Sequence, residues 1–277
     1  MSSVITVFPA VWAVARREFK MFFRYPSWFI SLIIWPSLFP IGYIFVCKAL
    51  AGPNGESLST YASYSGTTDY ISYILIGTFM WMWLNVMLWG FGQALRTEQI
   101  RGTLESNWLA PLQKWFLLLG SSVYDMLRWM MFMVIAGIEF YFIFGFRVQG
   151  SLWLMLLVVL LSIPSIYGVG MVFASLVLWA KQANTPVNVV RGVMMVFTGM
   201  TYPIAVLPQW MQAVSRYLPL THSIEAARAV AAGSGLKAIS GNVEYLLISG
   251  VILFILGFAG FGRTERIISQ HGSLGHH

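Results

Sequence analysis

The chain has 277 residues, of which 58% are hydrophobic and 10% are charged, whereas about 25% of the residues of a soluble domain are charged. So few charges do not cover the surface of a water-soluble enzyme of this length, and the high apolar content excludes a disordered chain. The only cysteine, Cys47, excludes an intrachain disulfide and a metal site made of several cysteines. The composition therefore indicates an integral membrane protein.

The first 26 residues predict an amphipathic helix that lies in the membrane interface, ahead of the first span. Its apolar residues recur at intervals of three and four, which places them on one helix face: Phe8, Val11, Trp12, Ala15, Phe19 and Phe22. Its remaining surface carries basic residues that suit the anionic headgroups of the inner leaflet: Arg16, Arg17, Lys20 and Arg24. Two interpretations are open, a simple anchor and a lever that touches a cytoplasmic partner.

Six apolar stretches are long enough to cross a bilayer, which takes about 20 helical residues. They cover residues 27–47, 71–95, 115–146, 152–180, 187–207 and 243–261. Continuous apolar runs of this length exclude a β-barrel, whose strands alternate between apolar and polar residues. The predicted fold is all-α, with a six-span transmembrane domain over residues 27–262 and a tail over residues 263–277. The first run has no signal-peptide cleavage site, so we expect it to be retained.

Lysine and arginine residues near the spans predict the orientation, because these residues concentrate in cytoplasmic loops. With a cytoplasmic N-terminus, five of the 17 basic residues lie on the outer side: Lys48, Arg147, Arg216, Arg228 and Lys237. Arg128 lies inside the third span and the others lie on the inner side. We therefore expect a multi-pass protein of a prokaryotic inner or plasma membrane with both termini cytoplasmic, contacts with membrane lipids and no nucleic-acid partner. The histidines at the end of the tail resemble a purification tag and are assigned to no site.

The segment between the second and third spans predicts a short cytoplasmic helix. Thr97 is suited to cap the start of this helix, Glu98 lies in its first turn and Pro111 follows its end. Arg101 and Glu105 are four residues apart and therefore pair on one helix face. A charged short helix at the cytoplasmic surface suits insertion into a cleft on another protein. The alternative is a solvated connector.

Three charged residues fall inside or near the third span, where a charge at mid-bilayer costs at least about 2.5 kcal/mol: Asp125, Arg128 and Glu139. At 100° per residue, all three lie within about 60° on one helix face. Asp125 and Arg128 are close enough to pair, which lowers their cost. Glu139 lies about 21 Å further along the helix, so we expect it to meet a partner helix, a water-filled route or the outer headgroups.

The stretch after the fifth span is too long for a tight turn and too amphipathic for a free loop. It is divided into helix-sized pieces by Pro203, Pro208 and Pro219. The large apolar side chain of Trp210 must be shielded from water. Short helices separated by prolines at the outer face are typical of a segment that re-enters the membrane. The alternative is a small exposed cap.

Two motifs resemble the permease subunits of type-2 ABC transporters (ABC-2 type). The first lies between the second and third spans, before Pro111, and consists of Glu98, Arg101, Gly102, Thr103, Leu104 and Glu105. The second follows the fifth span and consists of Pro203, Pro208, Trp210, Pro219, His222, Glu225 and Arg228. Together with the six spans and the amphipathic N-terminal helix, these motifs extend the resemblance over most of the chain.

The resemblance implies a dimer of permeases, with an identical second copy, bound to two ABC ATPase subunits that hold ATP and Mg. The first motif is then similar to the coupling helix that seats in the ATPase. The second resembles the short helices that close the outer end of the pathway. Among family members, the chain looks closest to those that export drugs and antibiotics.

The sequence contains no motif for catalysis. There is no G-x-x-x-x-G-K-[ST] phosphate loop, so another subunit or a gradient must supply the energy. There is also no H-E-x-x-H zinc motif and no G-x-S-x-G nucleophile motif. We therefore expect no catalytic residue, no metal site and no cofactor in this chain.

The predicted function is the transmembrane subunit of an ATP-driven exporter of an apolar or amphipathic substrate, such as a drug, an antibiotic or a lipid-like molecule. One alternative is an exporter of a lipid-linked polysaccharide in the same family. A second is a membrane-embedded enzyme that modifies lipids with His222, Glu225 or Asp125. A third is a gradient-driven transporter, but we see none of the inverted repeats expected for one.

Overall fold

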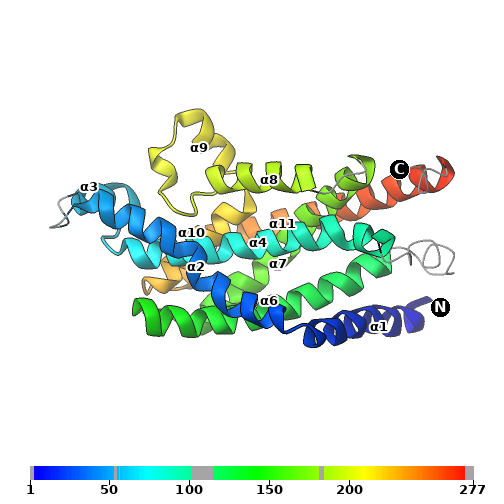
Figure 1. Cartoon of the computed structure of the whole chain (residues 1–277). Helices are drawn as coiled ribbons and strands as arrows, with labels where there is room; N and C mark the ends of the chain where they lie inside the picture. Colours follow the sequence, from blue (N-terminus) through cyan, green and yellow to red (C-terminus); the bar gives the residue numbers. More distant parts are fainter. Residues whose placement is uncertain (1–2, 53–54, 56, 101–114, 181–183, 272–277) are drawn as a thin grey trace.

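The structure is a computed structural model, which describes residues 3–52, 55, 57–100, 115–180 and 184–271. Every regular element in these residues is a helix, and the long helices form one elongated bundle (Figure 1). The elements are α1 (Ser3–Arg24), α2 (Pro26–Ala51), α3 (Leu58–Ser65), α4 (Tyr70–Ile100), α6 (Trp115–Phe144), α7 (Leu152–Ala180), α8 (Asn184–Phe197), the 3₁₀ turn η1 (Ile204–Val206), α9 (Gln209–Ser215), α10 (Pro219–Ala231) and α11 (Leu236–His271).

Five of the helices in the described residues are long and apolar enough to cross a membrane. They contain the candidate spans Pro26–Ala51, Tyr70–Gly90, Val123–Phe144, Leu152–Phe173 and Leu236–Gly260. A helix satisfies its backbone N–H and C=O groups within the segment, as the hydrocarbon core of a membrane requires. The predicted class, an all-α integral membrane protein, is therefore confirmed.

The segment predicted as the fifth span contains a shorter helix than expected. Helix α8 has 14 residues and ends at Phe197, whereas the prediction extended the span to Leu207. At 1.5 Å per residue this helix is about 21 Å long, less than the roughly 30 Å of a bilayer core. It ends early because Gly199 takes a left-handed conformation with φ of 64° and the chain is extended at Pro203.

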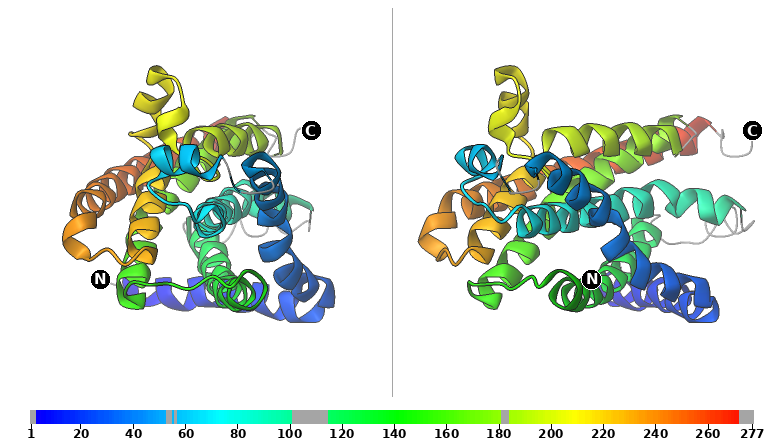
Figure 2. Two further views of the ribbon diagram at one scale, coloured as in Figure 1. Left: turned by 90° about the vertical axis from the view of Figure 1, so that its left-hand side faces the viewer. Right: turned by 60° about the vertical axis from the view of Figure 1, so that its left-hand side comes forward.

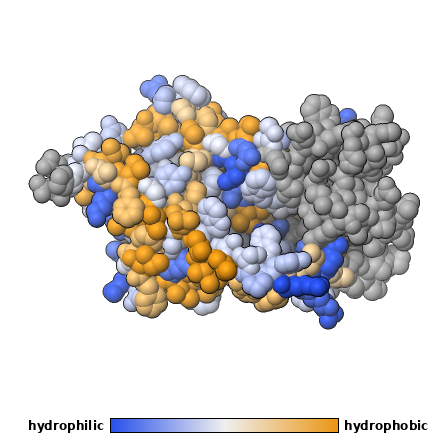
Figure 3. Space-filling view, in the orientation of Figure 1, coloured by the Kyte–Doolittle hydropathy of each residue, from blue (hydrophilic) through white to orange (hydrophobic). Residues whose placement is uncertain are grey.

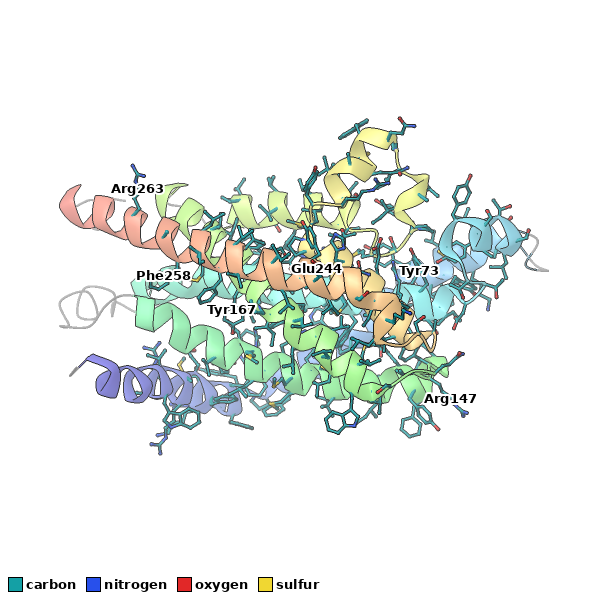
Figure 4. The ribbon with its side chains drawn as sticks, turned by 180° about the vertical axis from the view of Figure 1, so that it is seen from behind. Tyr73, Arg147, Tyr167, Glu244, Phe258 and Arg263 are labelled. Carbon is teal, nitrogen blue, oxygen red and sulfur yellow. The ribbon has the colours of Figure 1, made fainter. Side chains whose placement is uncertain are left out.

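The two ends of the bundle carry different segments (Figure 1). One end, which we call the tail end, holds the first residues of α1, Ile100 of α4, Trp115 of α6 and the last residues of α7 and α11. The other end, which we call the cap end, holds α3, α9 and the turn between α6 and α7. Arg263 lies towards the tail end, while Arg147 and Tyr73 lie towards the cap end (Figure 4).

Helix α4 occupies the centre of the bundle, with α2, α6, α7, α8 and α10 packed around it (Figure 2). Its side chains are buried over several turns, among them Leu75, Trp83 and Leu88. The ring of Trp83 lies 4.3 Å from the ring of Trp129 on α6, between centroids. Large side chains therefore fill the centre of the bundle.

Helices α7 and α11 pack closely because two glycines lie where their backbones meet. A Cβ at Gly168 would collide with the backbone of Leu253, and one at Gly257 would lie 2.7 Å from the carbonyl oxygen of Gly168. Nearby, the Ser165 hydroxyl lies within hydrogen-bond distance of the carbonyl oxygen of Leu246, at 3.3 Å. Small residues that let two helices approach are typical of membrane bundles.

Helix α1 has the predicted amphipathic character, and its apolar face packs against α6. Ala15 and Phe22 are buried, and the ring of Phe19 lies 5.1 Å from the ring of Tyr124 on α6. The predicted basic residues lie elsewhere on the helix: Arg16, Lys20 and Arg24 are exposed, and Arg17 forms an ion pair of 2.8 Å with Glu18. Hydrophilic surface lies over α1 and broad apolar surface over α2 (Figure 3). The apolar face of α1 therefore belongs to the bundle.

Candidate functional site

The residues predicted to couple the chain to an ATPase begin at the tail end of α4. The prediction that Thr97 caps a separate short helix is wrong, because α4 continues without a break to Ile100. The residues that follow the apolar stretch, from Ala94 to Gln99, are mostly strong helix formers and prolong the helix. Glu98 lies in this last turn of α4.

The other predicted coupling residues lie outside the described residues: Arg101, Gly102, Thr103, Leu104 and Glu105.

Asp125 and Arg128 form the predicted pair. Nη2 of Arg128 donates to Oδ1 of Asp125 at 3.0 Å, one helical turn away on α6. Asp125 is buried and lies directly against α4, because a Cβ at Gly90 would collide with its carboxylate. The guanidinium of Arg128 also lies over the ring of Trp28 on α2, at 5.8 Å. The pair therefore joins α6 to α4 and α2, which is a packing role.

Glu139, the third charged residue of α6, meets a partner helix. Its Oε2 accepts a hydrogen bond of 2.5 Å from the hydroxyl of Ser37 on α2. Of the three surroundings that the sequence left open, the structure shows this one. The hydrogen bond connects α2 to α6 closer to the cap end than the contact between Trp28 and Arg128.

The predicted prolines divide the segment after α8 as expected. Pro203 precedes η1, Pro208 precedes α9 and Pro219 is the first residue of α10, a position where the missing N–H of proline costs nothing. Helix α10 then returns into the bundle and packs against α4, α7 and α11. Helix α9 lies at the surface, where Trp210 is 64% exposed (Figure 1). The segment therefore combines an inserted helix with a surface helix.

Arg228 of α10 fastens this segment to α4. Its Nε and Nη2 donate to the carbonyl oxygen of Tyr73 at 3.2 and 3.0 Å, and its guanidinium lies over the Tyr73 ring. Its Nη1 donates to the carbonyl oxygen of Gly199 at 3.0 Å, and its Nη2 also donates to that of Met200 at 2.7 Å. A Cβ at Gly77 would collide with Met200 and Arg228. We call these five residues the cap clamp.

His222 connects the start of α10 to α11. Its Nε2 donates to the carbonyl oxygen of Arg216 at 2.9 Å, its Nδ1 lies 2.8 Å from Oδ1 of Asn242, and its ring stacks on Tyr245 at 3.9 Å. Glu225 is exposed, and within the described residues no hydrogen bond joins it to His222. Since neither residue contacts Asp125, the structure does not bring together the residues proposed for an enzyme.

Arg191 is a residue whose place the sequence did not predict. The sequence placed it inside the predicted span 187–207 and counted it with the basic residues of the cytoplasmic side, but the structure places its guanidinium over two indole rings of α4. The distances to the ring centroids are 5.4 Å for Trp81 and 5.8 Å for Trp89. The sequence held one signal of this contact: Trp81, Asn85 and Trp89 recur every four residues, which places them on one face of a helix.

In the part of the chain that the structure describes, no group of three or more His, Cys, Asp or Glu side chains lies close enough to hold a metal ion. A sequence model described as ABC-2 type transporter matches residues 9–231 of the chain. A comparison with curated proteins finds no significant match.

Proposed function

The chain belongs to the ABC-2 type transporter family, and from this premise we propose that it is the membrane subunit of an ATP-driven exporter. Permeases of this family are non-catalytic transporter components that pair with ABC ATPase subunits. We propose further that two ATPase copies bind two identical permease copies, and that ATP and Mg lie in the ATPases.

The central position of α4 supports a pathway between two permease copies. Side chains such as Trp83 and Leu88 fill the centre of the single chain, so a substrate would have to pass along its surface. The face formed by α2 and α8 offers such a surface, since Trp35 on α2 and Val189 and Val193 on α8 are exposed. In our proposal, the second copy and membrane lipids cover this face.

A continuous α4 supports mechanical coupling. The helix has 31 residues, about 46 Å at 1.5 Å per residue, and reaches from the cap clamp at Tyr73 to Glu98 at the tail end. A force applied around residues 98–105 by the ATPase would therefore act on a helix whose far end holds α10 through Arg228. In this proposal, Glu98 to Glu105 transmit the movement and the cap segment responds to it.

Three contacts towards the cap end support a closed outer gate. The hydroxyl of Tyr43 on α2 lies 3.8 Å from Sδ of Met195 on α8. The ring of Phe197 lies 6.1 Å from the ring of Trp210, and Arg228 holds α10 against α4. We propose that the transported molecule passes when these contacts separate, and that it is apolar or amphipathic, as in the drug-exporting members of the family.

The coupling proposal is tested by replacing Arg101 or Glu105 with alanine. The permease and its ATPase are reconstituted in sealed vesicles, and ATP hydrolysis is measured together with transport of a fluorescent amphiphile such as 1-anilinonaphthalene-8-sulfonate. We expect each variant to lose most of its transport, or to bind the ATPase more weakly, while remaining folded, because the proposed contact between the permease and the ATPase is weakened. Lys237→Ala, an exposed basic residue near the cap end, is the control and should behave as the unaltered chain.

Two outcomes would contradict the proposal. In the first, both variants retain the ATPase and transport normally. In the second, the purified chain transports its substrate in vesicles that contain no ATPase.

A further inference from the structure

Arg191 is a cation in the middle of α8 with no acidic partner among the described residues. Its one hydrogen bond runs from Nη1 to Oδ1 of Asn188, a neutral amide on the same helix, at 3.1 Å. Its Nε is buried and makes no hydrogen bond. The α4 residue beside it, Trp81, lies in the middle of the candidate span Tyr70–Gly90. An ionisable residue at membrane depth is costly, which makes Arg191 a candidate functional residue.

The surroundings of Arg191 combine π-faces with polar atoms that lack partners. Its guanidinium lies over Trp81 and Trp89, which stabilise a positive charge through their rings. Asn85 lies between these residues along α4, one turn from each. Nε1 of Trp81 and Oδ1 of Asn85 are both buried without a hydrogen-bond partner. We call Trp81, Asn85, Trp89 and Arg191 the indole site.

The indole site lies on the tail side of the contacts between α2 and α8. The ring of Phe39 on α2 stacks on Trp81 at 5.0 Å with an angle of 4° between the planes. One turn closer to the cap end, Tyr43 contacts Met195. Figure 3 shows hydrophilic surface at the level of α8, next to weakly polar and apolar surface. A molecule held at Arg191 would therefore lie below the closed outer gate and between aromatic walls.

We propose that the indole site binds the anionic group of the exported molecule, which is an amphiphile with a carboxylate, sulfonate or phosphate on an apolar body. The inference rests on the proposed function. The guanidinium donates to the anion, and the partly exposed rings of Trp89 and Phe39 contact the apolar body. The site selects against cationic amphiphiles, because Arg191 repels them at a depth where water screens little.

A pair of matched fluorescent probes tests the charge preference. The complex of the chain with its ATPase is placed in phosphatidylcholine nanodiscs and titrated with anionic 1-pyrenebutyrate or with neutral 1-pyrenebutanol. Saturable energy transfer from tryptophan to pyrene reports binding. We expect Arg191→Gln to weaken the binding of pyrenebutyrate about tenfold or more, as the loss of a charged hydrogen bond implies, and to leave that of pyrenebutanol nearly unchanged.

A second variant addresses the same site without removing the arginine. Asn85→Asp keeps the shape of the side chain and places a carboxylate on the face of α4 that Arg191 covers. We expect this carboxylate to compete with the anionic probe, so that pyrenebutyrate binds more weakly while pyrenebutanol does not. Arg191→Lys keeps the charge and should retain more pyrenebutyrate binding than Arg191→Gln. Arg147→Gln is the control, because Arg147 also lies over an aromatic ring, Tyr141 at 5.7 Å, but towards the cap end.

The results separate the proposal from its competitors. The proposal is overturned if Arg191→Gln and Asn85→Asp leave pyrenebutyrate binding unchanged. It is also overturned if they weaken the binding of both probes equally. Equal weakening that accompanies loss of the permease dimer would make Arg191 an interface residue. Nanodiscs that contain phosphatidylglycerol distinguish the source of the anion: displacement of pyrenebutyrate points to a lipid headgroup, and its absence to a soluble amphiphile. Transport without an ATPase would contradict the proposed exporter, while a charge preference at Arg191 would still stand.

Discussion

At the cap end, the guanidinium of Arg228 donates hydrogen bonds to backbone carbonyl oxygens of two segments that are distant in the sequence. The carbonyls of Gly199 and Met200 follow the end of α8 and therefore have no helical N–H to accept from. Arg228 donates to both of them and to the carbonyl of Tyr73 on α4. Buried polar groups are costly when unpaired, so the cap clamp determines where the chain can turn after α8.

Arg228→Gln should destabilise the cap end. Glutamine is uncharged and too short to donate to all three carbonyl oxygens. Hydrogen bonds to charged groups contribute about 1.5–3 kcal/mol each to stability. We expect the free energy of unfolding to fall by about 2–4 kcal/mol, measured as thermal or denaturant unfolding in detergent micelles. Arg216→Gln, at an exposed arginine of the same segment, is the control, and equal stability of the two variants would contradict the clamp.

A glycine pair provides an independent measurement of the same clamp. Gly77→Ala introduces a Cβ into the position occupied by Met200 and Arg228, whereas Gly42→Ala on α2 introduces one into open space. We expect Gly77→Ala to lower the stability as Arg228→Gln does. Gly42→Ala should leave the stability unchanged or raise it slightly, because alanine favours a helix over glycine by about 1 kcal/mol.

Among the helices, α9 and α10 differ in what they bury. Helix α10 buries Leu220, Ile224 and Val230 against its neighbours, so its place is determined by packing. Helix α9 has seven residues, and Ser215 is its only fully buried residue. A short helix with so little burial opens more readily than the long helices around it, which suits a moving part of an outer gate.

Removing Pro208 and Trp210 should affect the gate and not the ATPase. The double variant Pro208→Ala and Trp210→Ala loses the break before α9 and the ring contact between Trp210 and Phe197. We expect transport to fall while ATPase binding, measured by co-purification, stays unchanged. Trp153→Ala is the control, because Trp153 is 81% exposed at the cap end of α7. Loss of the ATPase from the double variant would place Pro208 and Trp210 outside the gate.

For the molecule as a whole, basic residues predict which end lies in the cytoplasm. The tail half of the molecule holds α1, with exposed Arg16, Lys20 and Arg24, and the exposed Arg263 of α11 (Figure 1). The surface of the middle of the bundle is rich in large apolar side chains, such as Trp35 on α2 and Val134 on α6. If the membrane surrounds this middle section and the tail end lies in the cytoplasm, the basic residues and the apolar surface are both accounted for.

Cysteine labelling checks this orientation. Cys47 is the only cysteine, so Cys47→Ser supplies a background without thiols. In it, Lys237→Cys near the cap end should react with a membrane-impermeant maleimide in intact cells, and Arg263→Cys at the tail end should react only after permeabilisation. The opposite pattern would reverse the proposed direction of transport.

The sequence by itself determined the properties that depend on neighbouring residues. The number of consecutive apolar residues predicted six membrane helices, and five of them are long enough in the structure, because crossing a bilayer requires a local stretch of sufficient length. The spacing of Pro203, Pro208 and Pro219 predicted the division of the cap segment, since proline acts on the adjoining backbone. The pairing of Asp125 with Arg128 followed from helical periodicity, because the two residues are one turn apart.

The tertiary structure decided what depends on residues far apart in the chain. The end of α8 at Phe197 follows from the left-handed turn at Gly199 and the cap clamp, which a count of apolar residues does not contain. The sequence placed Arg191 near the cytoplasmic end of the fifth predicted span, and only the packing of the helices shows that it lies over Trp81 and Trp89 of α4. The contacts of Arg191 with Trp81 and Trp89, and those of Arg228 with Tyr73, join residues more than a hundred positions apart, and their geometry depends on how whole helices fit together rather than on any local pattern.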